Sequence, residues 1–395
     1  MQNPDILILG AGPAGLSTAL HLARDFPHLT SRILVLDKVR HPRPKLCAGG
    51  LVRDAEAILQ RLGLDVDEVP HVDASAAHFD FEGRGLSIRN RKSHTLRVIR
   101  RNEFDAWLAG KVREQGIEIR EQVNVKDVKP DDEGVTVVTD QGEFRAQVVV
   151  GADGSKGVTR RCVLPREPVH TARVLEVITP VGQIANLSSK AQIGNLRHKK
   201  NEAFFDFFGV PSGVEGYTWD FPTQIQGQPM RCWGIFDANL NPDSDKPALK
   251  ETLAEEMSRH GFELGDYELQ GHPIRWYAPW TRISVPRVLL AGDAAGADPL
   301  FGEGISMALG YGAVASVEIG EAFQRGDFSF RRYPRRVARS GLGQTLLVRW
   351  VIAQVVYNFK WRWFQILLWR LLQPIVVAVA WIFVLNWAGR LPNKK

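Results

Sequence analysis

The feature that most constrains the fold lies at the start of the chain, where a short apolar run leads into a glycine-rich turn. Ile6–Leu9 is a run of four aliphatic residues, typical of a strand buried on both faces of a parallel sheet. Three glycines follow at the spacing of a GxGxxG turn, namely Gly10, Gly12 and Gly15. The first permits a tight turn, the second lets a pyrophosphate approach the backbone, and the third lets the next helix pack closely on the strand. The segment therefore predicts a Rossmann-like unit with an anion site at the helix N-terminus.

A second apolar run, Ile33–Leu36, ends in Asp37, which follows Gly15 by 22 residues. A carboxylate at this position can accept hydrogen bonds from the hydroxyls of an adenosine ribose. Strand, glycines, helix, second strand and terminal acid occur in order, so the pattern favours dinucleotide binding over a plain glycine turn. The acid favours an unphosphorylated ribose, as in FAD or NAD, although Lys38 and Arg40 leave contact with a phosphate open.

Two later segments repeat the arrangement of a buried strand that ends in an acid at a glycine turn. Residues 147–150 are followed by Asp153 in a Gly-Ala-Asp-Gly sequence, and residues 288–290 lead to Asp293 in Ala-Gly-Asp-Ala-Ala-Gly. Ligands of open α/β sheets bind outside the carboxyl ends of strands, where such turns lie. An NAD dehydrogenase needs no second and third turn of this kind, so the pattern favours FAD.

These segments, spread over residues 5–310, resemble the FAD-dependent oxidoreductases of the para-hydroxybenzoate hydroxylase fold. The resemblance implies that Asp153 lies in a turn shared by flavin and electron-donor handling and that Asp293 binds the ribityl chain of FAD. It also implies that Gly304 and Ile305 offer backbone N–H groups to the isoalloxazine ring. Arg101 matches the family arginine that contacts the cofactor.

Two local motifs indicate a branch of this family. Residues 44–50 read Pro-Lys-Leu-Cys-Ala-Gly-Gly, and residues 216–222 read Gly-Tyr-Thr-Trp-Asp-Phe-Pro. Together they resemble the geranylgeranyl reductase family, which saturates isoprenoid double bonds. One departure is Gly157, where the wider family usually has a small hydroxyl residue. The resemblance implies cofactor contacts at Ala14, Asp37, Cys47, Ala48, Gly50, Arg101, Val125, Asp293, Gly304 and Ile305.

The two motifs also supply the candidate catalytic and substrate residues. Cys47 is small, polarizable and weakly acidic, so beside a flavin it could influence proton delivery, whereas a free cysteine is otherwise usually a buried structural thiol. Tyr217, Trp219 and Phe221 alternate along the chain, so all three point to one face of a strand. That face is either a core stripe or an apolar wall for a prenyl chain, and the resemblance favours the wall.

The resemblance implies an α/β fold whose domains are interleaved along the chain. We expect a Rossmann-like FAD-binding domain, an antiparallel-sheet substrate domain over the flavin, and a helical hydrophobic C-terminal tail. The expected strands of the substrate sheet are residues 173–180, 203–208, 217–222 and 231–236. The expected ranges are 1–70, 97–165 and 280–325 for the FAD-binding domain, 71–96 and 166–279 for the substrate domain, and 328–395 for the tail.

The net charge of +6 is unevenly distributed along the chain. After Asp327 there are twelve Lys and Arg and no acidic residue, so the part before it carries 38 basic and 44 acidic side chains. The tail also holds six of the eleven Trp. Cations, Trp and aliphatic residues without acids predict contact with an anionic membrane surface, at its cytoplasmic face, and give no indication of nucleic-acid binding.

Within the tail, residues 371–389 carry no charge. As one helix they would span about 28 Å, close to the thickness of the hydrocarbon layer. A membrane span, an in-plane anchor and a helix packed on the enzyme therefore all stay open.

The sequence predicts an enzyme, an FAD-dependent reductase that saturates carbon–carbon double bonds of a prenyl chain by hydride transfer from reduced flavin. The substrate would be a geranylgeranyl-type lipid, an isoprenoid or a menaquinone side chain, and electrons would come from NAD(P)H or from a protein carrier such as reduced ferredoxin. A flavin monooxygenase or halogenase is one alternative, and a non-catalytic membrane flavoprotein or electron-transfer partner is another. The scattered histidines and three cysteines without a CxxC pair predict no metal site.

Overall fold

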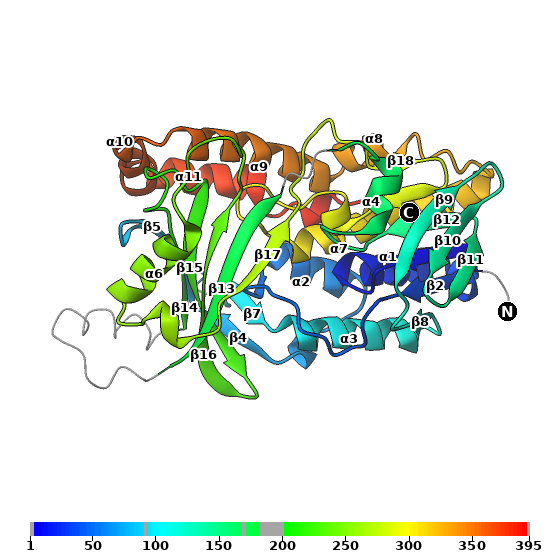
Figure 1. Cartoon of the computed structure of the whole chain (residues 1–395), viewed down its shortest axis with the longest axis horizontal. Coiled ribbons are helices and arrows are strands. Elements are labelled where there is room, and N and C mark those ends of the chain that lie inside the picture. The colour runs from blue at the N-terminus through cyan, green and yellow to red at the C-terminus, as the bar shows by residue number, and fades with distance from the viewer. Residues whose placement is uncertain (1–3, 91–92, 168–170, 182–200, 393–395) are drawn as a thin grey trace.

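Two large sheets lie side by side in the computed structural model, which describes residues 4–90, 93–167, 171–181 and 201–392, and a helical hairpin runs along both (Figure 1). The first sheet is parallel except at one edge strand. Its first strands are buried along their whole length, as their apolar sequences predict. Its six strands lie in the order β18 (Ser284–Val285), β19 (Val288–Leu290), β12 (Val148–Gly151), β1 (Ile6–Leu9), β2 (Ile33–Leu36) and β8 (Glu118–Arg120).

Two helices begin at the carboxyl edge of this sheet and pack on each other. They are α1 (Pro13–Asp25), which follows the glycine turn, and α7 (Ile305–Arg325), near the end of the FAD-binding part. The hydroxyl group of Ser17 donates to a backbone carbonyl of α7 at 2.8 Å. A Cβ at Gly312 would lie 2.5 Å from the Ser17 hydroxyl oxygen, so only glycine lets the helices approach this closely. The Rossmann-like α/β architecture expected from the sequence is confirmed.

Smaller elements lie in the FAD-binding part or beside it. One three-stranded sheet joins β11 (Gly142–Ala146), β10 (Val135–Thr139) and β9 (Val125–Pro130). A second, between the two large sheets, joins β3 (Gly50–Leu51), β7 (Leu96–Ile99) and β4 (His71–Ala74). The helices are α2 (Arg53–Arg61), α3 (Arg101–Glu114) and α4 (Val158–Val163), with short 3₁₀ turns η1 (Pro27–Arg32), η2 (Val66–Glu68) and η4 (Gly292–Ala294).

The second large sheet forms the substrate part, and all its pairs are antiparallel except one. α6 (Leu249–Arg259) packs on its outer face, with η3 (Leu264–Asp266) beyond it. The four strands expected here are present with shifts of a few residues, and residues 182–200 of the expected domain lie outside the described ranges. The seven strands lie in the order β17 (Gln270–Ile274), β13 (Ala172–Pro180), β16 (Gln228–Asp237), β15 (Gly216–Ile225), β14 (Glu202–Asp206), β5 (Ala76–Phe81) and β6 (Arg84–Arg89).

The C-terminal region forms a hairpin of helices along one long edge of the molecule (Figure 1). The outward arm is α8 (Tyr333–Arg339) followed by α9 (Gly341–Asn358), and α10 (Arg362–Ile366) lies at the far end. The chain turns through the π-helical η5 (Leu367–Leu371) and returns beside α9 as α11 (Gln373–Val379) and the π-helical η6 (Ala380–Val384). A last turn is η7 (Ala388–Arg390).

Side chains of the hairpin are buried against both large parts of the molecule. Trp387 is fully buried against α7, where a Cβ at Gly310 would lie 2.7 Å from its ring. Trp369 stacks on Phe207 of the substrate part with ring centroids 4.1 Å apart. The carboxylate of Asp54 accepts two backbone N–H groups near the end of the hairpin, at 2.9 and 2.8 Å. The hairpin thus joins the two parts along one edge.

Candidate active site

A cavity of about 1340 Å³ lies between the two large sheets and extends under the C-terminal hairpin. It gathers sequence motifs that lie up to about 300 residues apart along the chain. The predicted site residues that line it are Gly10, Gly12, Ala14, Asp37, Cys47, Ala48, Gly50, Arg101, Val125, Asp153, Tyr217, Trp219, Phe221, Asp293, Gly304 and Ile305.

The glycine turn after β1 forms one end of this cavity. Gly10 has a φ of 110°, and a Cβ there would lie 2.3 Å from the carbonyl oxygen of Ala152, so the turn requires glycine. Gly12 caps α1 and lines the cavity, where the free N–H groups of the helix begin. Gly15 does not line the cavity, because it lies beneath the turn, with its Cβ position 2.0 Å from the Gly10 carbonyl oxygen. Its place fits the close packing expected of the third glycine.

Asp37 lies at the end of β2, beside the glycine turn. One carboxylate oxygen accepts the Ala11 N–H at 2.6 Å, and the other accepts the Val39 N–H at 3.0 Å. Each oxygen has a further lone pair, so the carboxylate can still accept bonds from a ligand in the cavity. Asp37 thus fixes the turn, and its predicted contact with a ribose stays a prediction.

Basic side chains surround a buried carboxylate next to this end of the cavity. Asp105 of α3 is fully buried and accepts two hydrogen bonds from Arg101, at 2.8 and 2.9 Å, while Arg43 lies 3.1 Å away. Burial alone would lower the pKa of Arg101, but the Asp105 carboxylate outweighs this effect and raises the pKa. Two guanidinium groups share one carboxylate, so a net positive charge remains for the phosphates of a dinucleotide.

The structure gives a physical reason for the departure at Gly157. The carboxylate of Asp153 folds back over the turn and accepts the N–H and the hydroxyl group of Thr159, both at 2.9 Å. A Cβ at Gly157 would lie 2.1 Å from this carboxylate, so a hydroxyl residue has no room there. Burial raises the pKa of Asp153. The carboxylate therefore holds its own turn together, and a role in cofactor or donor binding stays a prediction.

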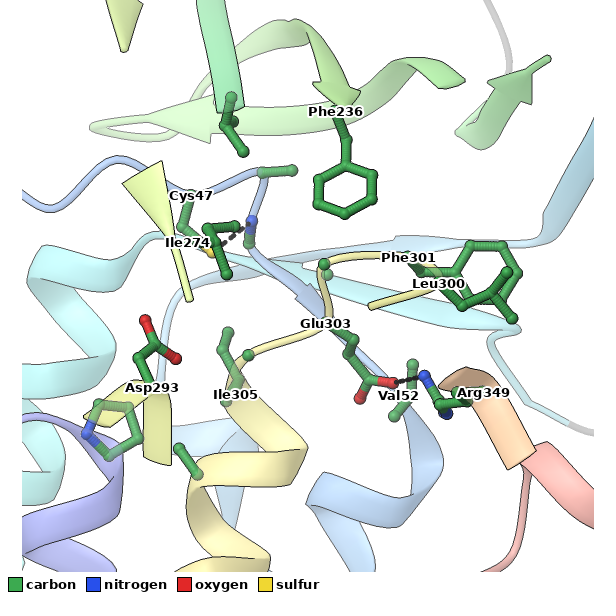
Figure 2. A pocket seen from close by; sticks show the side chains of 18 of the residues that line it. Cys47, Val52, Phe236, Ile274, Asp293, Leu300, Phe301, Glu303, Ile305 and Arg349 are labelled. Carbon is green, nitrogen blue, oxygen red and sulfur yellow. Dashed lines mark hydrogen bonds and ion pairs between the residues drawn. The ribbon is translucent and has the colours of Figure 1, made fainter. Parts of the chain in front are cut away.

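The acid and glycine turn before α7 also lines the cavity, and Figure 2 shows its residues. Asp293 on η4 faces the N-terminus of α7, where Gly304 caps the helix and Ile305 begins it. A Cβ at Gly304 would lie 3.6 Å from the nearest carboxylate oxygen of Asp293. The N-terminus of α7 carries unpaired N–H groups and a positive dipole, which suit the oxygen atoms of a flavin ring.

Cys47 lies on the loop opposite this turn (Figure 2). Its sulfur is half-buried and accepts the N–H of Gly49 at 3.4 Å. Gly49 has a φ of 79°, and a Cβ there would lie 1.9 Å from the carbonyl oxygen of Ile99, so this glycine is needed for packing. A Cβ at Gly50 would meet Phe221 and Leu96 only at ordinary contact distance. The structure places the Cys47 thiol in the cavity, where the predicted catalytic role requires it.

A buried carboxyl group behind Cys47 has no counterpart in the sequence prediction. Glu176 of β13 is 4% exposed, and its Oε2 atom has no hydrogen-bond partner in the described part of the chain. Burial raises the pKa of Glu176 to about 7, against the opposing effects of Arg100, the Cys232 thiol and the backbone N–H of Cys47. No local motif marks Glu176, because β13, β16 and the Cys47 loop meet only in the folded protein.

Two further titratable groups that the sequence prediction missed line the cavity beside Asp293. The ammonium group of Lys45 contacts Nε2 of His272 on β17. Burial lowers the pKa of Lys45 to about 8, opposed by Asp293, and burial lowers the pKa of His272 to about 4. Lys45 stands within the predicted motif of residues 44–50, which is the one signal that could have identified it.

The alternating aromatic residues of β15 form a wall of the cavity, as their spacing predicts. Trp219 lies against Gly234 of the neighbouring strand, where a Cβ would be 2.0 Å from its ring. The hydroxyl group of Tyr217 donates to the carbonyl oxygen of Phe301 at 2.5 Å. Phe221 packs edge-on against Phe205 with ring centroids 5.0 Å apart. The position on one face is therefore observed, and contact with a substrate stays a prediction.

The C-terminal hairpin supplies the other wall, which the sequence analysis missed. Arg349 of α9 is fully buried and reaches Asp298 at 2.5 Å and Glu303 at 2.8 Å, next to the turn before α7 (Figure 2). Glu303 stands between two glycines of that turn, a signal that could have marked it. The side chains of the hairpin that line the cavity are mostly apolar, among them Ile352, Val356, Leu368, Trp369, Ile375, Val376, Val379 and Trp381.

The chain is similar to known proteins over most of its length. Residues 3–310 match the model of a family described as FAD binding domain. An uncharacterized protein of Methanosarcina barkeri is 28% identical over 345 residues, which cover 86% of this chain and 81% of that protein. A protein of Methanosphaera stadtmanae named digeranylgeranylglycerophospholipid reductase 3 is 26% identical over 386 residues, which cover 91% of this chain and 88% of that protein.

Solved structures share the fold at lower identity. A geranylgeranyl bacteriochlorophyll reductase-like protein of Thermoplasma acidophilum superposes with a TM-score of 0.72 at 20% identity, over 97% of this chain and 93% of that chain. A halogenase in complex with FAD superposes with a TM-score of 0.63 at 15% identity, over 89% of this chain and 76% of that chain. The family match spans more than half of the chain and coincides with the residues that form the polar end of the cavity. The chain therefore belongs to the FAD binding domain family and is an FAD-dependent oxidoreductase, with relatives named digeranylgeranylglycerophospholipid reductase.

Proposed function

We propose that this protein is an FAD-dependent reductase that saturates carbon–carbon double bonds in the prenyl chain of a lipid, an isoprenoid or a menaquinone. The observation that carries the proposal is one continuous cavity with a polar end and an apolar end. The polar end has the glycine turn, Asp37, Arg101 and the N-terminus of α7, which suit the dinucleotide and ring of FAD. The apolar end has the aromatic wall of β15 and the aliphatic side chains of the hairpin, which suit a hydrocarbon chain.

The residues of the chain have distinct tasks in this reaction. Bound FAD in its reduced form would supply a hydride to one alkene carbon. The wall of Tyr217, Trp219 and Phe221 would hold the double bond at a fixed position and exclude water. The second alkene carbon takes a proton, and Cys47 is the candidate residue to influence its delivery, because the thiol faces the cavity (Figure 2). The reaction thus consumes one hydride and one proton for each bond saturated.

The oxidised cofactor must be reduced again after each turnover. As donors we propose NAD(P)H or a reduced protein carrier such as ferredoxin, because the sequence has no second GxGxxG turn for a separate nicotinamide domain. When one of these donors is added to holoenzyme with oxidised flavin, the absorbance spectrum should change to that of reduced flavin. A rate with one donor far above the rate with the other would identify it.

The reductase activity is tested by mass spectrometry without oxygen. Holoenzyme reduced with dithionite is incubated with a geranylgeranyl phospholipid or with menaquinone, and the quinone ring is reoxidised in air before analysis, because dithionite alone adds two hydrogen atoms to it. We expect a product heavier by two hydrogen atoms for each prenyl double bond reduced. Cys47→Ser should slow this reaction. Cys162→Ser is the matched control and should leave the rate unchanged, because Cys162 is a half-buried cysteine of α4 outside the cavity. Substrates left at their original mass would contradict the proposal.

The same assay distinguishes the alternatives. A product that carries an oxygen or halogen atom, formed only when oxygen is present, would indicate a monooxygenase or halogenase. Retained FAD that no substrate reoxidises would indicate a non-catalytic flavoprotein or an electron-transfer partner.

A further inference from the structure

The exposed apolar side chains of this protein gather on the C-terminal hairpin. Of the fifteen large hydrophobic side chains that are exposed in the described part of the chain, twelve lie between residues 347 and 383. α9 contacts η6, and η6 contacts α11, so the exposed side chains of these three helices form one surface. We call this surface the apolar platform and define it by Leu347, Val351, Val355, Ile375, Trp381 and Ile382. Apolar patches of this extent mark a binding surface.

The platform continues over the far end of the hairpin. Trp361 and Trp363 are more than half exposed there and stack on each other with ring centroids 6.0 Å apart. Tryptophan is favoured at the boundary between water and lipid, because its ring is apolar and its N–H group is polar.

The cavity opens within the platform. Val351 and Val355 of α9, and Ile375 and Trp381 of the returning arm, are exposed and also line the cavity. Side chains that face solvent on one side and the cavity on the other frame an entrance. An apolar chain could pass through this entrance without crossing water.

The charge of the same edge suits an anionic surface. The exposed side chains of Arg331, Arg332, Arg335 and Arg339 lie on α8 or just before it, on the long edge that also carries α9 (Figure 1). No acidic residue follows Asp327 in the sequence. Basic residues beside an apolar surface are attracted to anionic lipid headgroups.

The backbone of the hairpin favours a position in the plane of a bilayer over a crossing. Gln373–Arg390 is the one stretch of the described residues that is long and apolar enough to cross a membrane by length and composition, and 17% of it is buried. Its continuous helix, however, consists of seven α-helical and five π-helical residues and ends where Leu385 is extended, before the separate turn η7. These residues span about 18 Å, well short of a hydrocarbon layer of about 30 Å. Beyond them Trp387 is buried in the protein.

We infer that the apolar platform docks in the plane of an anionic phospholipid bilayer, with the entrance of the cavity open to the lipid. The docking surface follows from the exposed side chains, the arginines and the short helices alone. The use of the entrance by a prenyl chain rests on the proposed function.

The docking is tested by flotation of the FAD-loaded full chain with vesicles. We expect it to float with vesicles that contain phosphatidylglycerol, to float less with pure phosphatidylcholine, and to lose part of its binding at high salt. The double variant Trp363→Glu and Ile382→Glu changes side chains that are 60% and 59% exposed and do not line the cavity. It should lower vesicle binding by at least about tenfold while the absorbance of bound FAD is unchanged.

Ile225→Glu is the matched control, because Ile225 is an exposed apolar residue at the end of β15, away from the platform. It should float like the unchanged protein. The inference would be overturned if the platform variant floated as well as the parent, or if the parent bound no vesicle. It would also be overturned if the parent were a dimer that binds no vesicle and the variant were a monomer. If the protein docks on vesicles but reduces no lipid, the proposed function alone is contradicted. If it reduces detergent-dispersed lipid but does not dock, this inference alone is contradicted.

Discussion

The carboxyl group of Glu176 is buried on β13 with an unpartnered oxygen, and its pKa is raised to about 7 from a usual value of 4.5 because burial penalises its charged form. The folded protein therefore holds this proton more tightly than the unfolded chain does. Its contribution to stability is fully present below about pH 4.5 and is lost as the pH rises through 7.

Glu176→Gln replaces this group by a neutral one of the same shape. The free energy of unfolding of the parent, measured relative to the variant by urea denaturation, should fall by about 3 kcal/mol between pH 4.5 and pH 8. Two parallel profiles of stability against pH would show that Glu176 is ionised at its usual pKa.

Gly157 is a second residue whose replacement should measurably lower the free energy of unfolding. Gly157→Ser should destabilise the protein by about 1–3 kcal/mol, because the new Cβ displaces the Asp153 carboxylate and leaves the buried Thr159 N–H without its acceptor. Thermal unfolding of the holoprotein measures the loss. Gly110→Ala is the control, since its Cβ position in α3 meets nothing within 4 Å and alanine favours the helix. A melting temperature that is equal for Gly157→Ser and the parent would refute the steric argument.

At the scale of elements, α9 is held in place by one buried cation. Arg349→Met leaves the carboxylates of Asp298 and Glu303 buried without a positive partner, and the expected loss is about 3–5 kcal/mol of unfolding free energy. Burial raises the pKa of Glu303, so the variant should recover stability at low pH as the carboxyl groups take up protons.

Chemical denaturation at several pH values measures this effect. Arg335→Met, which changes an exposed arginine of α8, should stay within about 0.5 kcal/mol of the parent. Adding Asp298→Asn and Glu303→Gln to Arg349→Met should restore part of the loss. Equal stability of Arg349→Met and Arg335→Met would mean that the buried ion pairs do not hold α9.

The elements that the sequence predicted well are those whose partners lie nearby in the chain. The parallel strands and the glycine turn each carry a local pattern of apolar runs and glycines, so their type and position follow from the residues themselves. The C-terminal hairpin has no such pattern. Its burial depends on Gly310, which makes room for Trp387, and on Asp298 and Glu303, which pair with Arg349. Each partner lies about 50 to 80 residues away, and no rule of spacing links them.

The same reason explains what was missed in the site. The predicted residues of the glycine, acid and aromatic motifs converge on the cavity because motifs report local backbone geometry. Glu176, His272 and Arg349 come from strands and a helix without a motif. Only the packing of the two sheets and the hairpin brings His272 and Arg349 into the cavity and places Glu176 behind Cys47.

At the scale of the whole molecule, the hairpin forms one wall of the cavity and joins the two large parts. Removal of residues from 328 onward should expose the apolar lining and leave Asp298 and Glu303 without Arg349. We expect such a protein to aggregate or to lose bound FAD, measured by soluble yield and by the flavin absorbance. Truncated protein that binds FAD as tightly as the full chain would show that the hairpin is dispensable for the site.

The cavity wall formed by residues 375–386 has a consequence for the order of events during synthesis. The glycine turn at residues 10–15 leaves the ribosome long before the residues that complete the same cavity. Until the hairpin docks, the aromatic wall of the cavity is exposed to water, and a nascent chain in that open form is prone to aggregate. The site can therefore close only after the last residues of the hairpin have been made, and chains released before the hairpin docks would remain in the open form.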